Sequence, residues 1–227
     1  MLFAGGAVLV ERATQRGALR GLRTAYPVLL VVSGLLLAPV ALPILAPATW
    51  VRYYGFVTGA TAQERAHQRG APPQWLGDRY GWETLVATVA EVYHALPPEE
   101  RARACLFTSN YGEAGAIDRF GPAHGLPQAI SGHNSYYLWG PGTCTGEVVI
   151  TVGIPRDDLA AFFGEVTPAA TVTCDACMPE EHDLPVLVAR APRQPIEQLW
   201  PQVKHFTGSW LTSMRMSSTR SSSSGRR

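Results

Sequence analysis

The chain has 227 residues, of which 16% are charged and 46% hydrophobic, and its formal net charge is +1. About a quarter of the residues in an average soluble domain are charged, so the low fraction indicates that part of this chain lies outside water. A nucleic-acid-binding domain concentrates lysine and arginine on one element. Here most of the local positive charge precedes one apolar run or lies in the C-terminal tail, so we expect no nucleic acid among the partners.

The first 23 residues combine a short apolar stretch with a basic loop. The stretch MLFAGGAVLV stops at Glu11 and is too short to span a bilayer. We therefore interpret residues 1–23 as the end of one membrane helix, whose beginning is absent, followed by a cytoplasmic loop. The loop carries four arginines: Arg12, Arg16, Arg20 and Arg23.

Residues 24–51 form the longest apolar run, with no charged residue between Arg23 and Arg52. A bilayer core about 30 Å thick needs about 20 apolar residues of helix, and residues 26–45 supply them. We therefore predict a transmembrane helix within 24–51. Proline is tolerated in such a helix where neighbouring helices or waters satisfy the freed carbonyls. The prolines in question are Pro27, Pro39 and Pro43.

Two other interpretations of this run remain, a buried hairpin of a soluble core and a signal peptide. Its length, its distance from Met1 and the lack of a clear small-x-small cleavage site disfavour the signal peptide. Because arginines gather before the run, the positive-inside rule predicts that residues after Trp50 are exported. Trp50, Tyr53 and Tyr54 then fit an aromatic belt at the outer membrane interface.

The remaining chain predicts a juxtamembrane linker over 52–74, an exported domain over 75–210 and a disordered Ser/Arg tail over 211–227. Helices and short apolar runs alternate in the exported domain, which predicts a layered α/β fold with a mixed sheet and at least one parallel pair. Helices are expected over 82–96, 113–121, 155–166 and 195–206, and strands over 104–110, 146–153, 170–177 and 184–192. An RNA-binding role for the tail is disfavoured on an exported segment.

Four cysteines suit disulfides in an oxidising compartment, and Cys174 and Cys177 are close enough in sequence to pair with each other. The pairing of Cys105 and Cys144 stays open. A zinc site on the Cys174 pair with His182 lacks a second well-spaced pair of ligands, so we expect no metal. A thioredoxin-like role is disfavoured because acidic residues, which raise a thiol pKa, follow the pair.

Two further patterns resemble catalytic motifs, and in each a structural role is the preferred interpretation. GTCTG matches the spacing of a hydrolase nucleophile elbow with Cys144 as nucleophile, but a strand follows it where the elbow requires a helix. Asp157 and Asp158 could form a pair of carboxylates for acid/base chemistry. They begin a predicted helix, where acidic residues complement the helix dipole, so helix capping is the preferred interpretation.

The segment 110–142 is dense in aromatic, amide and imidazole groups. Asn110 to Glu113 lie where a strand ends and a helix begins, the place where open α/β sheets bind ligands. His133, Asn134, Tyr136 and Trp139 follow on the next strand and loop, in ISGHNSYYLWGPG. Such groups either bind a sugar or polar headgroup, or stabilise an irregular turn and anchor the core. Residue chemistry alone leaves both interpretations open.

Four parts of the chain together resemble the C-terminal portion of bacterial multi-pass glycosyltransferases of family 39. They are the predicted membrane span, RARACLFTSNYGEAGAIDRFGPAHGLPQAISGHNSYYLWGPG, GEVVITVG and CDACMPEEHDLPVLVAR. These enzymes are similar to dolichyl-phosphate-mannose:protein mannosyltransferases and to the aminoarabinose transferases that modify lipid A. The resemblance covers residues 26–206. It implies an enzyme that transfers a sugar from a polyprenyl-phosphate donor to an acceptor on the exported side of the membrane, without a cofactor.

In this family an acidic residue on the first exported loop acts as the base, and no acidic residue here matches that motif. We therefore expect no catalytic residue in this chain, which we interpret as a C-terminal fragment whose partners are the remaining membrane helices, the bilayer and the donor. Candidate substrate contacts are Glu113, Asp118, His133, Asn134, Tyr136 and Trp139. The alternative is a single-pass membrane-anchored module that binds a sugar or lipid headgroup.

Overall fold

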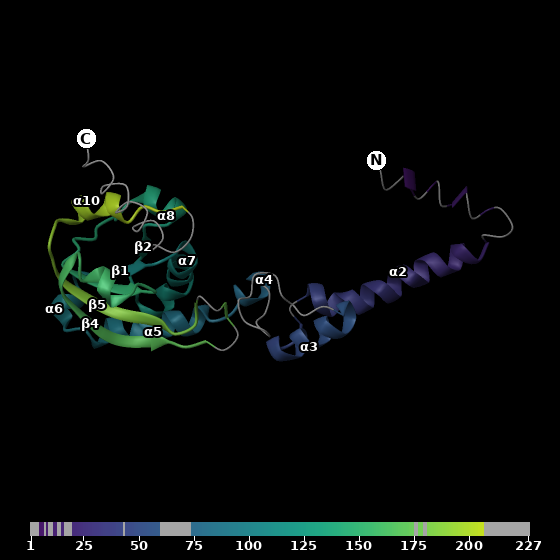
Figure 1. The fold of residues 1–227 in the computed structure, drawn as a ribbon, viewed down its shortest axis with the longest axis horizontal. Coiled ribbons are helices and arrows are strands. Elements are labelled where there is room, and N and C mark those ends of the chain that lie inside the picture. The colour runs from purple at the N-terminus through teal and green to yellow at the C-terminus, as the bar shows by residue number, and fades with distance from the viewer. Residues whose placement is uncertain are drawn as a thin grey trace, which may run out of the picture. The chain divides into compact units, whose positions relative to one another are not determined.

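The computed structural model describes residues 5, 6, 8, 11, 12, 15, 20–42, 44–59, 74–174, 177, 178 and 181–206. The chain divides into two compact units, Met1–Pro73 and Gln74–Arg227 (Figure 1). The predicted tail over 211–227 and residues 60–73 of the predicted linker lie outside the described residues.

The first unit contains helices α2 (Arg20–Ala41) and α3 (Pro47–Thr58). Within α2, Thr24–Ala41 is long and apolar enough to cross a membrane, by length and composition. The apolar run over 24–51 is not one continuous helix, because α2 ends at Ala41 and a second helix starts at Pro47. Proline lacks the N–H that continues a helix and favours its first turn, which explains why the second helix begins at Pro47. The predicted linker is likewise helical as far as Thr58.

Two aromatic side chains of α3 donate hydrogen bonds to backbone carbonyls of α2. Trp50 is buried, and its Nε1 donates to the Val40 carbonyl at 3.1 Å. That carbonyl belongs to the last turn of α2, where no intrahelical donor remains. Tyr53 donates its hydroxyl to the Leu36 carbonyl at 2.7 Å, and Tyr54 stacks on Trp50. The residues expected to form an aromatic belt therefore pack within this unit.

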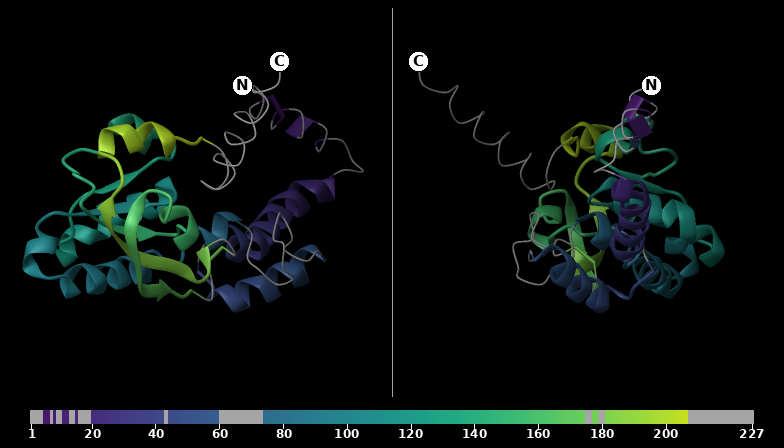
Figure 2. Two further views of the ribbon diagram at one scale, coloured as in Figure 1. Left: turned by 60° about the vertical axis from the view of Figure 1, so that its left-hand side comes forward. Right: turned by 90° about the vertical axis from the view of Figure 1, so that its right-hand side faces the viewer.

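The second unit is a mixed α/β domain built on a five-stranded sheet of order β2-β1-β3-β5-β4 (Figures 1 and 2). The strands are β1 (Ala104–Thr108), β2 (Ala129–Ser131), β3 (Val148–Val152), β4 (Phe163–Val172) and β5 (Leu184–Pro192). β1 is parallel to both β2 and β3, whereas β5 is antiparallel to β3 and β4. The predicted mixed sheet with a parallel pair is confirmed. The register of β4 shifts between Pro168 and Ala170 at the edge of the sheet.

Helices connect and cover these strands. They are α4 (Gln74–Gly77), α5 (Trp82–Ala95), α6 (Pro98–Arg101), α7 (Tyr111–Phe120), α8 (Asn134–Trp139), α9 (Arg156–Leu159) and α10 (Ile196–Leu199), with 3₁₀ turns η2 (Gly121–His124) and η4 (Trp200–Gln202). A parallel pair needs a crossover connection. α7 lies in the connection from β1 to β2, and α8 lies in the connection from β2 to β3.

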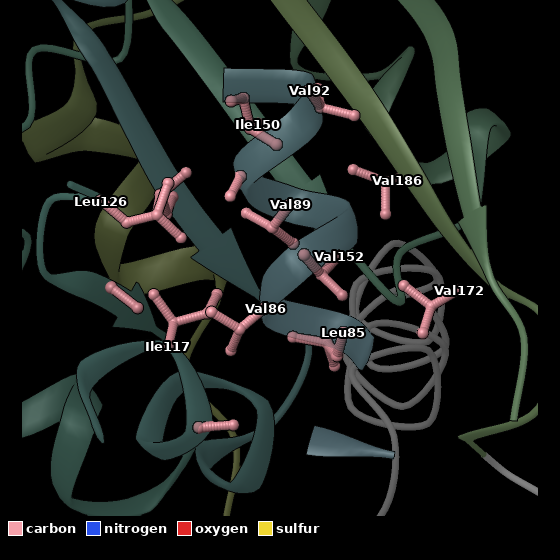
Figure 3. Close-up of a cluster of buried hydrophobic side chains, with 14 of the residues drawn as sticks. Leu85, Val86, Val89, Val92, Ile117, Leu126, Ile150, Val152, Val172 and Val186 are labelled. Atoms are coloured by element: carbon pink, nitrogen blue, oxygen red, sulfur yellow. The ribbon is translucent and has the colours of Figure 1, made fainter. Parts of the chain in front are cut away.

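One face of the sheet packs against α5 and α7. Alternate strand residues point to this face, so Ile150, Val152 and Val186 meet Val86 and Val89 of α5 (Figure 3). The helical spacing of Leu85, Val86, Val89 and Val92 thus predicts the buried stripe of α5. A helix without this stripe would have no apolar surface to bury on the sheet.

The opposite face is covered by short elements. Phe107, Val149 and Leu187 form a second core cluster with Leu159 of α9 and Trp200 of η4. The helix predicted over 155–166 is wrong beyond Leu159, because β4 already pairs with β5 at Phe163. The helix predicted over 195–206 breaks into α10 and η4, since Pro201 offers no N–H for an α-helical bond. The strand predicted over 170–177 ends at Val172.

We predict that Gly132→Ala destabilises the second unit and Gly115→Ala does not. A Cβ at Gly132 would lie 2.0 Å from the Val203 carbonyl oxygen, which is backbone and cannot rotate away. The expected loss is about 1–3 kcal/mol or more of unfolding free energy. Gly115 lies inside α7, and a Cβ there would have its nearest neighbouring atom at 3.9 Å. Alanine at this position is therefore expected to raise the unfolding free energy by up to about 1 kcal/mol. Urea denaturation of both variants measures the difference, and equal midpoints would contradict it.

Candidate functional site at the carboxyl edge of the sheet

Three parallel strands end at the same edge of the sheet, and the chain segments that follow them meet there. Ser109 follows β1, Gly132 follows β2 and Gly153 follows β3. Gly153 has a φ of +72°, and a Cβ there would lie 2.7 Å from Ser109 Oγ and 2.8 Å from Glu113 Oε1. The close approach requires glycine, and it brings the first turn of α7 against the end of β3.

Glu113 forms a capping box with Asn110 at the start of α7. The Asn110 Oδ1 accepts from the Glu113 amide at 2.9 Å, and Glu113 Oε2 accepts from the amides of Asn110 at 3.3 Å and Ser109 at 2.9 Å. The side chain is completely buried. Burial raises the pKa of Glu113 to about 8, while hydrogen bonds from Ser109 and Asn110 oppose that rise. Glu113 therefore stabilises the helix start and presents no surface to a ligand.

Asp118 connects three elements. Its Oδ1 accepts from the Ala129 amide at the start of β2, and its Oδ2 accepts from the Tyr136 hydroxyl of α8, both at 2.8 Å. Burial raises the pKa of Tyr136, and the hydrogen bond to Asp118 raises it further. Trp139 packs edge-on against Tyr136, with ring centroids 4.6 Å apart, and is 66% exposed. Of this group, Trp139 alone presents a broad ring face to solvent.

The C-terminal segment of the described chain runs alongside the continuation of β2. His205 pairs with His133 in an isolated parallel bridge. The His205 amide donates to the Gly132 carbonyl at 3.0 Å, and the Asn134 amide donates to the His205 carbonyl at 3.1 Å. Asn134 has a φ of +52°, a backbone conformation that asparagine tolerates better than most residues. The predicted loop is thus a short helix, α8, fixed at its start by backbone hydrogen bonds.

The two histidines stack with ring centroids 4.5 Å apart. The Nδ1 of His205 lies 2.9 Å from the Val203 carbonyl oxygen, and its Nε2 lies 3.0 Å from that of Ser109. These two contacts hold the His205 ring between the residue that follows β1 and its own C-terminal segment.

His133 is 9% exposed, and its Nδ1 is buried without a hydrogen-bond partner among the described residues. Burial lowers the pKa of His133, and the neighbouring His205 lowers it further. The ring of Tyr111, which is 55% exposed, lies 4.9 Å from the His133 ring. An orphaned nitrogen in a native interior calls for an explanation, and a bound water or ligand group supplies one.

The six predicted contacts therefore do not form one site. Glu113 and Asp118 stabilise helix and strand starts, Tyr136 is bonded to Asp118, and Asn134 begins α8. His133 and Trp139 keep groups available to a ligand. Sequence reasoning missed Tyr111 and His205. Because 96 residues separate Ser109 from His205, no local pattern signals their contact.

Disulfides pair all four cysteines. Cys105 of β1 is joined to Cys144 in the loop before β3, and Cys174 is joined to Cys177. Cys144 has no free thiol, which removes the hydrolase interpretation. Asp157 and Asp158 occupy the first turn of the four-residue α9, where acidic residues complement the helix dipole. In the part of the chain that the structure describes, no group of three His, Cys, Asp or Glu residues could hold a metal ion.

Comparisons of this chain with protein-family models, with curated proteins and with solved structures find no match. The functional interpretation therefore depends on the residues and their geometry.

We predict that, above pH 6.5, the unfolding free energy of the second unit depends less on pH in the Glu113→Gln variant than in the wild type. The folded state keeps the Glu113 proton up to about pH 8, whereas the unfolded chain loses it near 4.5. The folded state binds more protons in this window, so the unfolding free energy falls as pH rises, by at most about 1.4 kcal/mol per pH unit. Glutamine at this position also suits a capping box.

Urea unfolding at pH 6.5, 7, 7.5 and 8 measures how the unfolding free energy depends on pH in the wild type and in the Glu113→Gln variant. His133 contributes in the opposite direction, because its pKa is lowered, but only below its unfolded value of 6.5. Parallel slopes for wild type and Glu113→Gln above pH 6.5 would contradict the raised pKa.

Proposed function

We propose that the chain is part of a membrane glycosyltransferase that takes a sugar from a polyprenyl-phosphate donor, and that its α/β unit lies on the exported side. The observation that carries the proposal is a helix apolar enough to cross a membrane, followed in sequence by a separate α/β unit with all four cysteines paired. Disulfides persist in oxidising compartments and are rare in the cytosol. Arginines before the helix favour the same orientation.

The α/β unit is proposed to contribute substrate contacts from the carboxyl edge of its sheet and from α8. Trp139 offers an exposed ring, on which the C–H face of a pyranose can stack, and Tyr111 offers a second. The orphaned Nδ1 of His133 offers a hydrogen bond to a hydroxyl. These groups combine apolar faces with a few placed polar atoms, the usual chemistry of a small-molecule site.

Neither Glu113 nor Asp118 is suited to be the catalytic base. A pKa of about 8 would suit Glu113 for proton transfer at neutral pH. Its carboxyl group, however, is completely buried and bonded to Ser109 and Asn110. Asp118 is already bonded to two donors. The base is therefore proposed to lie on another part of the enzyme.

The second candidate is a single-pass membrane-anchored binding module that acts alone. It is favoured by the second unit's own two core clusters, one on each face of the sheet. The two candidates differ in whether binding alone, or transfer with additional membrane helices, is the activity.

We predict that Trp139→Ala and His133→Ala each slow sugar transfer at least about tenfold, equivalent to about 1.4 kcal/mol of transition-state stabilisation. The variants are made in the complete reading frame that contains this chain. Membrane vesicles with radiolabelled polyprenyl-phosphate sugar give the rate.

Trp139→Ala is the cleaner variant because the side chain is mostly exposed and little folding energy is lost. Glu91→Ala, an exposed position on α5, is the control and should keep the wild-type rate. Unchanged transfer in both site variants would count against the contact role. Binding of sugar by the purified chain, with no transfer in any membrane, would favour the anchored module.

We also predict that the chain stays in the membrane fraction after alkaline carbonate extraction, and that none of its cysteines reacts with a thiol-alkylating reagent before reduction. After denaturation and reduction, mass spectrometry should show four alkyl groups, because all four cysteines are paired. Release by carbonate would contradict the membrane assignment, and alkylation without reduction would contradict the exported location.

A further inference from the structure

A polar cavity of about 320 Å³ opens at the opposite, amino-terminal edge of the three parallel strands. Its walls come from the segments that precede β1, β2 and β3, together with Tyr93 of α5. This volume falls within the range of small-molecule pockets. His133 and Tyr111 follow the carboxyl ends of β2 and β1, and neither of them lines this cavity.

Two arginines line the cavity. Arg103 forms an ion pair with Glu147. Arg101 donates to the His94 carbonyl at 3.4 Å, and in the described ranges it has no carboxylate within ion-pair distance. The adjacent Glu100 is held instead by Arg190, through two hydrogen bonds of 3.0 and 2.7 Å. The charge of Arg101 is therefore uncompensated at the cavity wall.

Neutral polar groups stand beside this charge. Gln128 and Thr143 line the cavity, and no hydrogen bond engages either side chain within the described part of the chain. The Tyr93 ring and the aliphatic Ile130 supply apolar wall. An amide donates and accepts, and a hydroxyl does both, so this wall suits a ligand with several hydroxyl groups.

The loop wall of the cavity is held in shape covalently. Cys144 in this loop is bonded to Cys105 of β1, with Cα atoms 5.6 Å apart. The Cys144 amide donates to the Pro141 carbonyl at 3.1 Å, which closes a turn. Gly140 and Gly142 on either side of Pro141 have φ values of +83° and +57°, which glycine adopts readily. The disulfide thus attaches Thr143 to the same strand that follows the arginines.

We propose that this cavity is a binding site for an anionic monosaccharide. Arg101 pairs with the oxyanion of the ligand, and Gln128 and Thr143 bond its hydroxyls. Guanidinium binds carboxylate and phosphate through charge-assisted hydrogen bonds, so the shared chemistry is an oxyanion next to ring hydroxyls. The site is independent of the carboxyl edge and does not rest on the proposed sugar transfer.

The test measures binding to the full chain in detergent micelles by isothermal titration calorimetry. The probes are glucose 1-phosphate, glucuronate, neutral glucose and inorganic phosphate. Wild type should bind one or both of the charged sugars more tightly than glucose or phosphate. A preference for glucose 1-phosphate identifies a phosphate group, and a preference for glucuronate identifies a carboxylate.

Arg101→Gln should weaken that binding at least about tenfold, and Gln128→Ala should weaken it several-fold. Arg156→Gln, an exposed arginine on α9, is the matched control and should leave it unchanged. The double change Cys105→Ser with Cys144→Ser should also weaken binding. If that variant fails to fold, the Arg101 and Gln128 variants still decide the question. Equal affinity for glucose, equal affinity for inorganic phosphate, or an unaffected Arg101→Gln variant each overturn the proposal.

Discussion

The carboxyl edge of the sheet depends on how the chain leaves β1 at Ser109. The Ser109 amide donates to Glu113 and to Val152 of β3, and its carbonyl faces His205. One residue thereby connects the start of α7, the end of β3 and the C-terminal segment. The Glu113 carboxyl group is buried to make this connection, and its raised pKa is a consequence. Because these contacts fix the turn at Ser109, they also fix the position of the His205 ring, which stacks on His133.

Patterns of short range predicted the main elements. Apolar spacing in α5 and the short apolar runs of β1, β3 and β5 indicate a layered α/β fold, and the structure contains one. Errors arose where long-range pairing overrode local composition. Phe163 and Glu165 lie in a stretch of helical composition, yet they pair with β5. The apolar run after Arg23 predicts a single helix, but prolines divide it between α2 and α3.

The candidate site was harder to predict than the fold. His133 and Trp139 could be singled out because they stand in a segment dense with functional groups. Sequence alone could not show that Glu113 and Asp118 satisfy backbone amides, since their partners are fixed only by folding. His205 reaches Ser109 through a separation of 96 residues. The polar cavity could not be predicted from local patterns either, because its wall combines three segments that are distant in sequence.

The interrupted register of β4 has a consequence for association between copies of the chain. β4 is an edge strand, and an unbroken edge offers its free amides to a strand of another molecule. Pro168 has no amide hydrogen, and the register shift beside it bends the ladder. At the other edge, β2 has three residues, and the bridge between His133 and His205 follows it. Both margins of the sheet therefore discourage the growth of intermolecular β-structure.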